Sequence, residues 1–113
     1  MSDACIFCRI VAGTIPATLV ASNEHGVAFR DVNPQAPSHL LVIPRRHVAS
    51  LAEATDGAAL GALMLLAAEV ARSDGLAEAG YRVVVNTGND GGQTVHHLHL
   101  HVLGGRAMHW PPG

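Results

Sequence analysis

Apolar residues recur along part of the chain with the spacing of a helix. The segment 5–12 has apolar residues three to four positions apart and ends at Gly13, which predicts a short helix. A longer helix is expected from a cap at Thr55 or Asp56 to about Ser73. One apolar face of this helix is expected to consist of Leu60, Leu63, Met64, Ala67 and Ala71.

Elsewhere the apolar residues form short runs that are separated by glycine, proline and polar turns. Five runs predict strands, and they cover 19–21, 27–31, 39–43, 81–86 and 94–103. The connections between the early strands are too short for parallel crossovers. The sequence therefore predicts an α+β fold, with a five-stranded antiparallel sheet, the long helix on one face and a short N-terminal helix.

Composition and charge narrow the class of protein. The chain has 113 residues and 11.7 kDa, so a single domain over 1–113 is expected. Only 14% of residues are charged, against a typical ~25%, which favours burial of apolar surface against a second copy. The net charge of −2 excludes the strongly basic surface of a nucleic-acid-binding protein.

The sequence predicts no membrane partner. No apolar run approaches the ~20 residues of a membrane span, and residues 1–4 lack the basic start of a signal peptide. A cytoplasmic location is therefore expected.

Histidine carries the candidate chemistry. The chain has 8 histidines, and His97, His99 and His101 alternate with Leu98 and Leu100. Because side chains alternate across a strand, the three imidazoles are expected to share one face, roughly 6.6–6.8 Å apart, while the leucines pack into the core.

Three interpretations of this pattern compete. It is a polar strand face, a metal site that Asp90 completes, or a site of nucleophilic catalysis by imidazole. The adjoining loop 90–94 favours catalysis. Its glycines let backbone N–H groups approach an oxyanion, and Gln93 and Thr94 add hydrogen bonds, which together suit a phosphate.

The segment from Gln93 to Val102 resembles the motif of the histidine triad (HIT) family, His-x-His-x-His flanked by hydrophobic residues. Segments 31–39, 41–44 and 81–86 resemble the same family. The ending 103–113 is similar to the histidine triad nucleotide-binding (Hint) branch. This resemblance implies a homodimer with one ten-stranded sheet, in which the C-terminal tail 104–113 lies near the partner's site.

The resemblance also implies roles for individual residues. His99 would be the nucleophile that attacks the α-phosphorus of a purine nucleotide, and water would then release AMP or GMP. The residues implied for the phosphate and its proton relay are His101, His97, His39, Asn86, Gly92, Gln93, Thr94 and Val95. Those implied for the nucleoside are Asp31 at the ribose and Val32, Ile6, Phe7, Ile10, Phe29 and Leu41 at the base. No organic cofactor is implied.

Cys5 and Cys8 depart from many Hint sequences. A Cys-x₂-Cys pair alone is ambiguous between zinc binding, redox chemistry and chance, although a disulfide is less expected in a reducing cytosol. Other HIT branches carry such a pair in a zinc site whose remaining ligands resemble His47 and His97. The resemblance thus implies one structural zinc ion.

Three functions remain open from the sequence. The leading one is a nucleoside phosphoramidase, which cleaves the P–N bond of adenosine or guanosine 5′-phosphoramidates. The alternatives are a dinucleoside polyphosphate hydrolase of the same family and a nucleotide-binding adaptor dimer with incidental catalysis.

Overall fold

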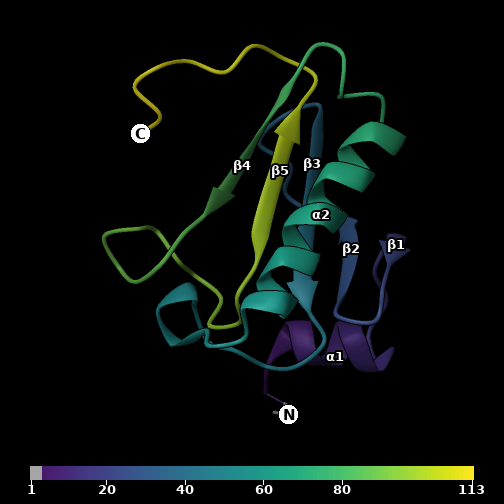
Figure 1. The fold of residues 1–113 in the computed structure, drawn as a ribbon, viewed down its shortest axis with the longest axis vertical. Coiled ribbons are helices and arrows are strands. Elements are labelled where there is room, and N and C mark those ends of the chain that lie inside the picture. The colour runs from purple at the N-terminus through teal and green to yellow at the C-terminus, as the bar shows by residue number, and fades with distance from the viewer. Residues whose placement is uncertain (1–3) are drawn as a thin grey trace.

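Five strands form one antiparallel sheet in the order β1-β2-β3-β5-β4 (Figure 1). The computed structural model describes residues 4–113, so residues 1–3, which belong to the segment predicted not to begin a signal peptide, lie outside the described residues. The elements in chain order are α1 Ile6–Ala12, β1 Leu19–Ser22, β2 Gly26–Arg30, β3 Ser38–Pro44, the 3₁₀ turn η1 Leu51–Glu53, α2 Gly57–Ser73, β4 Tyr81–Val85 and β5 Leu100–Gly104. The predicted α+β class and sheet are confirmed.

Helix α2 packs along one face of the sheet (Figure 1). The Asp56 carboxylate accepts a hydrogen bond from the Ala59 N–H and begins the helix, as predicted. At Gly26 of β2 the helix approaches so closely that an added Cβ would lie 2.5 Å from Leu63 Cδ2. The buried residues of this layer include Leu40, Val42, Leu63, Leu66, Val70, Leu98, Leu100 and Val102.

The apolar face predicted for α2 was partly wrong. Leu63, Ala67 and Ala71 are buried as expected, but Met64 is 51% exposed, and Leu66 and Val70 take part in the core. The buried stripe is therefore rotated from the predicted one, and the absence of a side chain at Gly26 leaves room for Leu63 and Leu66 against β2.

Helix α1 covers part of the opposite face of the sheet. Its N-cap is Cys5, and Gly13 ends it with a φ of 75°. Phe7 and Ile10 pack there against alternate residues of the sheet, which are Val27, Phe29, Leu41 and Ile43. The two faces of β3 thus serve two separate cores, which explains why the whole strand is buried.

The last strand begins at Leu100 and not at position 94. The Leu98 N–H donates to the Val48 carbonyl at 2.7 Å, and the Gln93 side-chain amide donates to the Ala49 carbonyl at 2.7 Å. The segment 93–98 therefore follows the loop after β3, and sheet pairing starts where Val85 meets Leu100.

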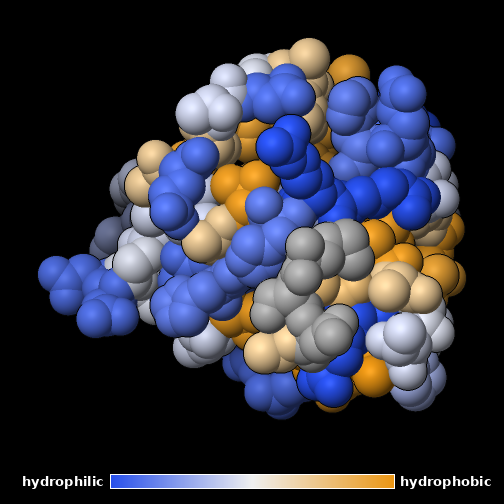
Figure 2. Space-filling model, turned by 90° about the horizontal axis from the view of Figure 1, so that it is seen from below, coloured by the Kyte–Doolittle hydropathy of each residue, from blue (hydrophilic) through white to orange (hydrophobic). Residues whose placement is uncertain are grey.

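Much apolar surface remains exposed, as the low charge content suggested. Figure 2 shows hydrophobic patches among hydrophilic residues on the face that is seen from below. Large exposed apolar side chains are Ile6, Leu19, Val20, Val32, Leu51, Met64, Leu65, Tyr81 and Trp110. Within residues 4–113, no helix has the length and hydropathy needed to span a membrane.

Candidate active site

The three alternating histidines lie on the side of the sheet that carries α1. Only His101 belongs to β5, yet the alternation persists, since Leu98 and Leu100 are buried in the α2 layer. The rings of His99 and His101 are 5.0 Å apart, and both His97 and His99 present a face or edge to the Phe7 ring. His96, the fourth histidine of this segment, is exposed and has no place in the cluster.

The tautomer of neutral His99 is set by the backbone carbonyl of His97. Its Nδ1 lies 2.7 Å from the carbonyl oxygen of His97. A carbonyl can only accept, so Nδ1 carries the hydrogen and Nε2 keeps its lone pair. His99 is 6% exposed, so the lone pair on Nε2 is largely desolvated and has a set orientation.

A second chain of hydrogen bonds fixes His101. The Gln35 N–H donates to His39 Nδ1 at 3.0 Å, so the hydrogen of neutral His39 must be on Nε2. That Nε2 lies 2.9 Å from His101 Nδ1, which therefore accepts and leaves a hydrogen on His101 Nε2. Among the residues that the structure describes, His101 Nε2 is the one buried side-chain nitrogen or oxygen without a hydrogen-bond partner. It is a donor prepared for a ligand oxygen.

Burial favours the neutral form of the His101 and His39 rings. It lowers the pKa of His101 to about 4, with the neighbouring His99 and His39 adding to the effect. Burial also lowers the pKa of His39, and the Asp31 carboxylate, 3.4 Å from His39 Nε2, opposes that shift. Both rings can therefore act as neutral donors and acceptors near pH 7.

The loop between β4 and the histidines is held in place by the Gln93 side chain. Gln93 is buried, and its side-chain amide is already bonded to Gly88 N–H and to the carbonyls of Ala49 and Val95. It therefore braces the loop and is not free for a phosphate, which departs from the prediction. Of the other residues expected here, Gly92 and Thr94 are exposed, and Asn86 and Val95 are half-buried.

The residues expected to hold a nucleoside divide into two groups. Phe7, Ile10, Phe29 and Leu41 are buried together between α1 and the sheet. Ile6 and Val32 lie outside this cluster and are 44% and 99% exposed. The Asp31 carboxylate sits beside His39 and accepts a hydrogen bond from the Asn33 N–H at 2.8 Å.

The four expected metal ligands come together. The ligand atoms of Cys5, Cys8, His47 and His97 all lie within 4.8 Å of one another. Four of the measured separations are 3.2, 3.3, 3.3 and 3.6 Å. Tetrahedral zinc at ~2.3 Å from sulfur and ~2.0–2.1 Å from nitrogen places its ligand atoms about 3.3–3.8 Å apart. The cluster therefore has the dimensions and donor set of a closed zinc site.

The second nitrogen of His97 supports the same assignment. Its Nε2 lies 2.9 Å from the Pro44 carbonyl oxygen, so Nε2 carries the hydrogen and Nδ1 offers a lone pair to the cluster. The contributions of Pro44 and Gln35 could not be predicted from side-chain chemistry, because both residues act through main-chain groups.

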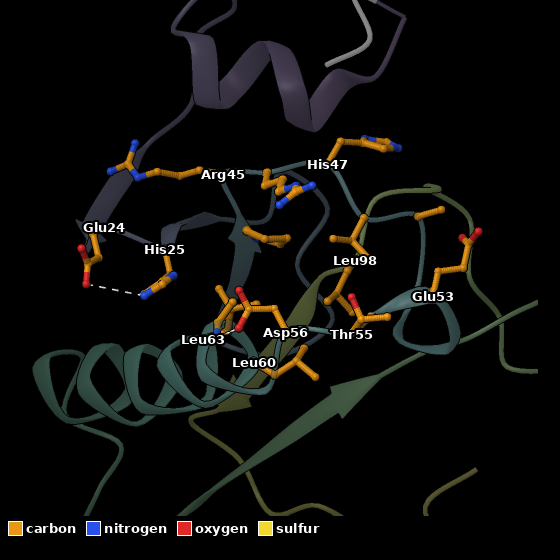
Figure 3. A pocket seen from close by; sticks show the side chains of 16 residues that line it. Glu24, His25, Arg45, His47, Glu53, Thr55, Asp56, Leu60, Leu63 and Leu98 are labelled. Carbon is orange, nitrogen blue, oxygen red and sulfur yellow. Dashed lines mark hydrogen bonds and ion pairs between the residues drawn. The ribbon is translucent and has the colours of Figure 1, made fainter.

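A cavity of about 510 Å³ lies on the α2 side of the sheet, and none of His97, His99 and His101 lines it (Figure 3). Leu60, Leu63 and Leu98 line it on the apolar side, and the Glu24–His25 pair is on its rim, at 3.5 Å. His47 touches both this cavity and the metal-ligand cluster. The cavity contains none of the residues expected at a phosphate or nucleoside site.

Comparison with known proteins agrees with this geometry. The sequence profile of the HIT domain matches residues 12–108. An uncharacterized HIT-like protein of Synechococcus elongatus is 53% identical over 115 residues and is covered completely, as is this chain. A HIT family hydrolase from Legionella pneumophila is 49% identical in its crystal structure, with a TM-score of 0.93, over 96% of this chain and 99% of its own.

A third relative bears on the cysteine and histidine cluster. It is a zinc-bound histidine triad family protein from Mycobacterium smegmatis, 33% identical, with a TM-score of 0.83 over 91% of this chain and 76% of its own. The matched domain includes the three histidines and nearly all of the sheet. The chain therefore belongs to the HIT family.

Proposed function

We propose that this protein is a purine nucleoside phosphoramidase, a hydrolase of the Hint type that uses His99 as a covalent nucleophile. The observation that carries the proposal is the 2.7 Å contact between His99 Nδ1 and the His97 carbonyl, which leaves Nε2 as a buried lone pair. His101 Nε2–H is a buried donor near the same ring. A nucleophile beside a free donor suits attack on a phosphoryl group.

The proposed reaction has two displacements at phosphorus. His99 Nε2 attacks the α-phosphorus of an adenosine or guanosine 5′-phosphoramidate, the P–N bond breaks, and the nitrogen takes a proton from solvent water and leaves as the amine. His101 Nε2–H donates to a phosphoryl oxygen and stabilises the charge that develops there. Water then attacks the nucleotidyl-imidazole, the bond from phosphorus to His99 breaks, and AMP or GMP is released.

The nucleoside is proposed to lie along α1. Asp31 accepts hydrogen bonds from the ribose hydroxyls, and the base rests on the apolar cluster that contains Phe7, Ile10, Phe29 and Leu41. Ile6 and Val32 are exposed enough to close over the base. The phosphate is held by the backbone around Gly92, Thr94 and Val95, with Asn86 and His39 at its border.

A structural zinc ion is proposed at Cys5, Cys8, His47 and His97, where it would join α1 to the segment before β5. Burial raises the pKa of the Cys5 thiol, so a bound cation would be needed to keep it as a thiolate at pH 7.

Elemental analysis of untagged protein should give one zinc per chain, and Cys8→Ser should abolish zinc binding. Chelation should lower the unfolding midpoint more than it lowers nucleotide affinity; zinc-free protein after growth with zinc would refute the site.

The proposed biological form is a cytoplasmic homodimer, and each chain forms one domain over residues 1–113.

Steady-state kinetics on an adenosine 5′-phosphoramidate and on a diadenosine polyphosphate, measured side by side, test the activity. We expect kcat/KM to favour the phosphoramidate by at least tenfold, and rapid alkaline quenching to trap AMP covalently on His99. A preference for the polyphosphate would support the alternative hydrolase, and turnover of neither would support an adaptor role.

A further inference from the structure

The chain that leaves β5 returns to the loop between β2 and β3, at two points. An added Cβ on Gly105, whose φ is 87°, would lie 2.8 Å from Pro37 Cβ, so only glycine permits this approach. One residue later, Arg106 Nη2 donates to the Gln35 carbonyl at 3.1 Å. The segment that follows β5 thus holds the loop between β2 and β3, which lies about 70 positions earlier in the sequence.

Gln35 is also the residue whose N–H fixes the hydrogen-bond chain through His39 to His101. Gln35 is itself exposed, and among the described residues its side chain makes one hydrogen bond, from Nε2 to the Asn33 carbonyl within the same loop, at 3.1 Å. The aim of its N–H toward His39 Nδ1 therefore depends on what holds the residue from outside the loop.

Loss of that N–H would reverse the chain of donors. His39 Nδ1 could then take the ring hydrogen, and His39 Nε2 would become an acceptor. His101 would have to place its hydrogen on Nδ1 to keep the 2.9 Å contact, which leaves a lone pair on the buried Nε2. A lone pair there would repel the phosphoryl oxygen that the donor form attracts.

We propose that Arg106 is a positioning residue for catalysis, which acts through Gln35 and His39 to keep the hydrogen of His101 on Nε2. The kinetic part of this inference rests on the proposed phosphoramidase function, but the part that concerns ring tautomers does not. The guanidinium is suited to the task because it stays charged and donates to the carbonyl at any physiological pH.

The test is long-range ¹H–¹⁵N NMR of the ligand-free protein, which distinguishes the two nitrogens of each imidazole. In the native chain His39 and His101 should both show hydrogen on Nε2 alone. In Arg106→Ala both rings should move to a mixture of tautomers, and kcat for the phosphoramidate should fall roughly fivefold with KM within twofold, as expected for loss of one exposed charge-assisted hydrogen bond. Arg106→Lys should recover part of both effects.

Arg82→Ala is the matched control. Arg82 also donates to the C-terminal tail, since its Nη2 lies 2.8 Å from the His109 carbonyl oxygen. Among the described residues it has no hydrogen bond to Gln35. It should leave both tautomers unchanged. Unaltered ring nitrogens in Arg106→Ala, or equal changes in Arg82→Ala, would overturn the inference. Gln35→Pro removes the amide hydrogen directly and must give the mixed tautomers if the chain of donors is as described. If no phosphoramidate is hydrolysed, the proposed function fails while the NMR result still decides the tautomers.

Discussion

Main-chain groups set the state of each buried imidazole. The carbonyl of His97 orients His99, the carbonyl of Pro44 orients His97, and the N–H of Gln35 orients His39. A backbone group is a fixed donor or acceptor that does not titrate, so it selects one tautomer of each neutral ring. The chemistry at this site therefore depends on loops as much as on histidines.

His99→Ala should lower kcat by roughly three orders of magnitude or more, because removal of a covalent nucleophile leaves only binding and charge stabilisation. Nucleotide affinity should remain, which calorimetry with AMP would check. His96→Ala is the control, since that side chain is exposed and close in sequence. Near-normal turnover in His99→Ala would exclude the covalent mechanism.

The lowered pKa of His101 predicts a loss of stability in mild acid. Its folded value is about 4, against ~6.5 in the unfolded chain, so between these values the unfolded state binds more protons. The stabilising contribution is complete above pH 6.5 and falls away as the pH drops toward 4. The free energy of unfolding, measured in urea, should fall from pH 7 to pH 5 in both proteins. The fall in His101→Asn should be about 1–2 kcal/mol smaller than in the native chain. An equal loss in both would contradict the assignment.

At the scale of elements, the close approach of α2 to β2 sets the core. An added Cβ at Gly26 would also lie 2.8 Å from the Ile43 carbonyl oxygen, which belongs to the backbone of the next strand. The Leu63 side chain can rotate, but the Ile43 carbonyl cannot move without disturbing the sheet. The position therefore limits how the whole α2 layer can be repacked.

Gly26→Ala should destabilise the protein by about 1–3 kcal/mol through overpacking. Gly61, in α2, has nothing within 4 Å of an added Cβ. Gly61→Ala should therefore stabilise the helix by up to about 1 kcal/mol. Urea midpoints of the two variants, measured together, should move in opposite directions, and a shift of the same sign in both would refute this account.

The sequence predicted the order and type of these elements well, because periodicity and breakers are local signals. The N-cap at Asp56 and the strand ends near Gly26 and Pro44 required nothing from the rest of the fold. The late start of β5 did, since Leu98 bonds to Val48, which lies 50 positions earlier. The metal-ligand cluster was anticipated by resemblance, whereas the link from Arg106 to Gln35 joins main chain to a distant side chain and left no pattern to find.

At the scale of the whole molecule, the exposed apolar surface and an unpaired sheet edge point to association. Strand β4 ends the sheet order, and Tyr81 on it is 38% exposed. Leu63 and Ala67, on the apolar face predicted for α2, are buried against the sheet of their own chain and cannot contact a second copy. Leu65, at 74% exposure, and Met64 remain on the outer side of α2.

Sedimentation at micromolar concentration should give twice the 11.7 kDa chain mass. Removal of residues 107–113 keeps Arg106 and should leave that mass at two copies, because the sheet and α2 would supply most of the buried area. It should alter the ranking of phosphoramidates that differ in the leaving amine, since Trp110, 83% exposed in the single chain, is free to face the partner's site. A single-chain mass, or an unchanged ranking, would count against this assembly.

The two attachments of His97 limit what protein engineering can change at this position. Its ring belongs to the thiol cluster, and its carbonyl holds the hydrogen of His99. A cysteine at position 97 would still offer a metal ligand, but its shorter side chain would draw the backbone toward the cluster and pull that carbonyl away. Cys5 is half-buried and lies at the start of α1, so replacing it by histidine would not move the backbone next to His99. The cluster could therefore be redesigned at its α1 end, while its other end is tied to the reactive ring.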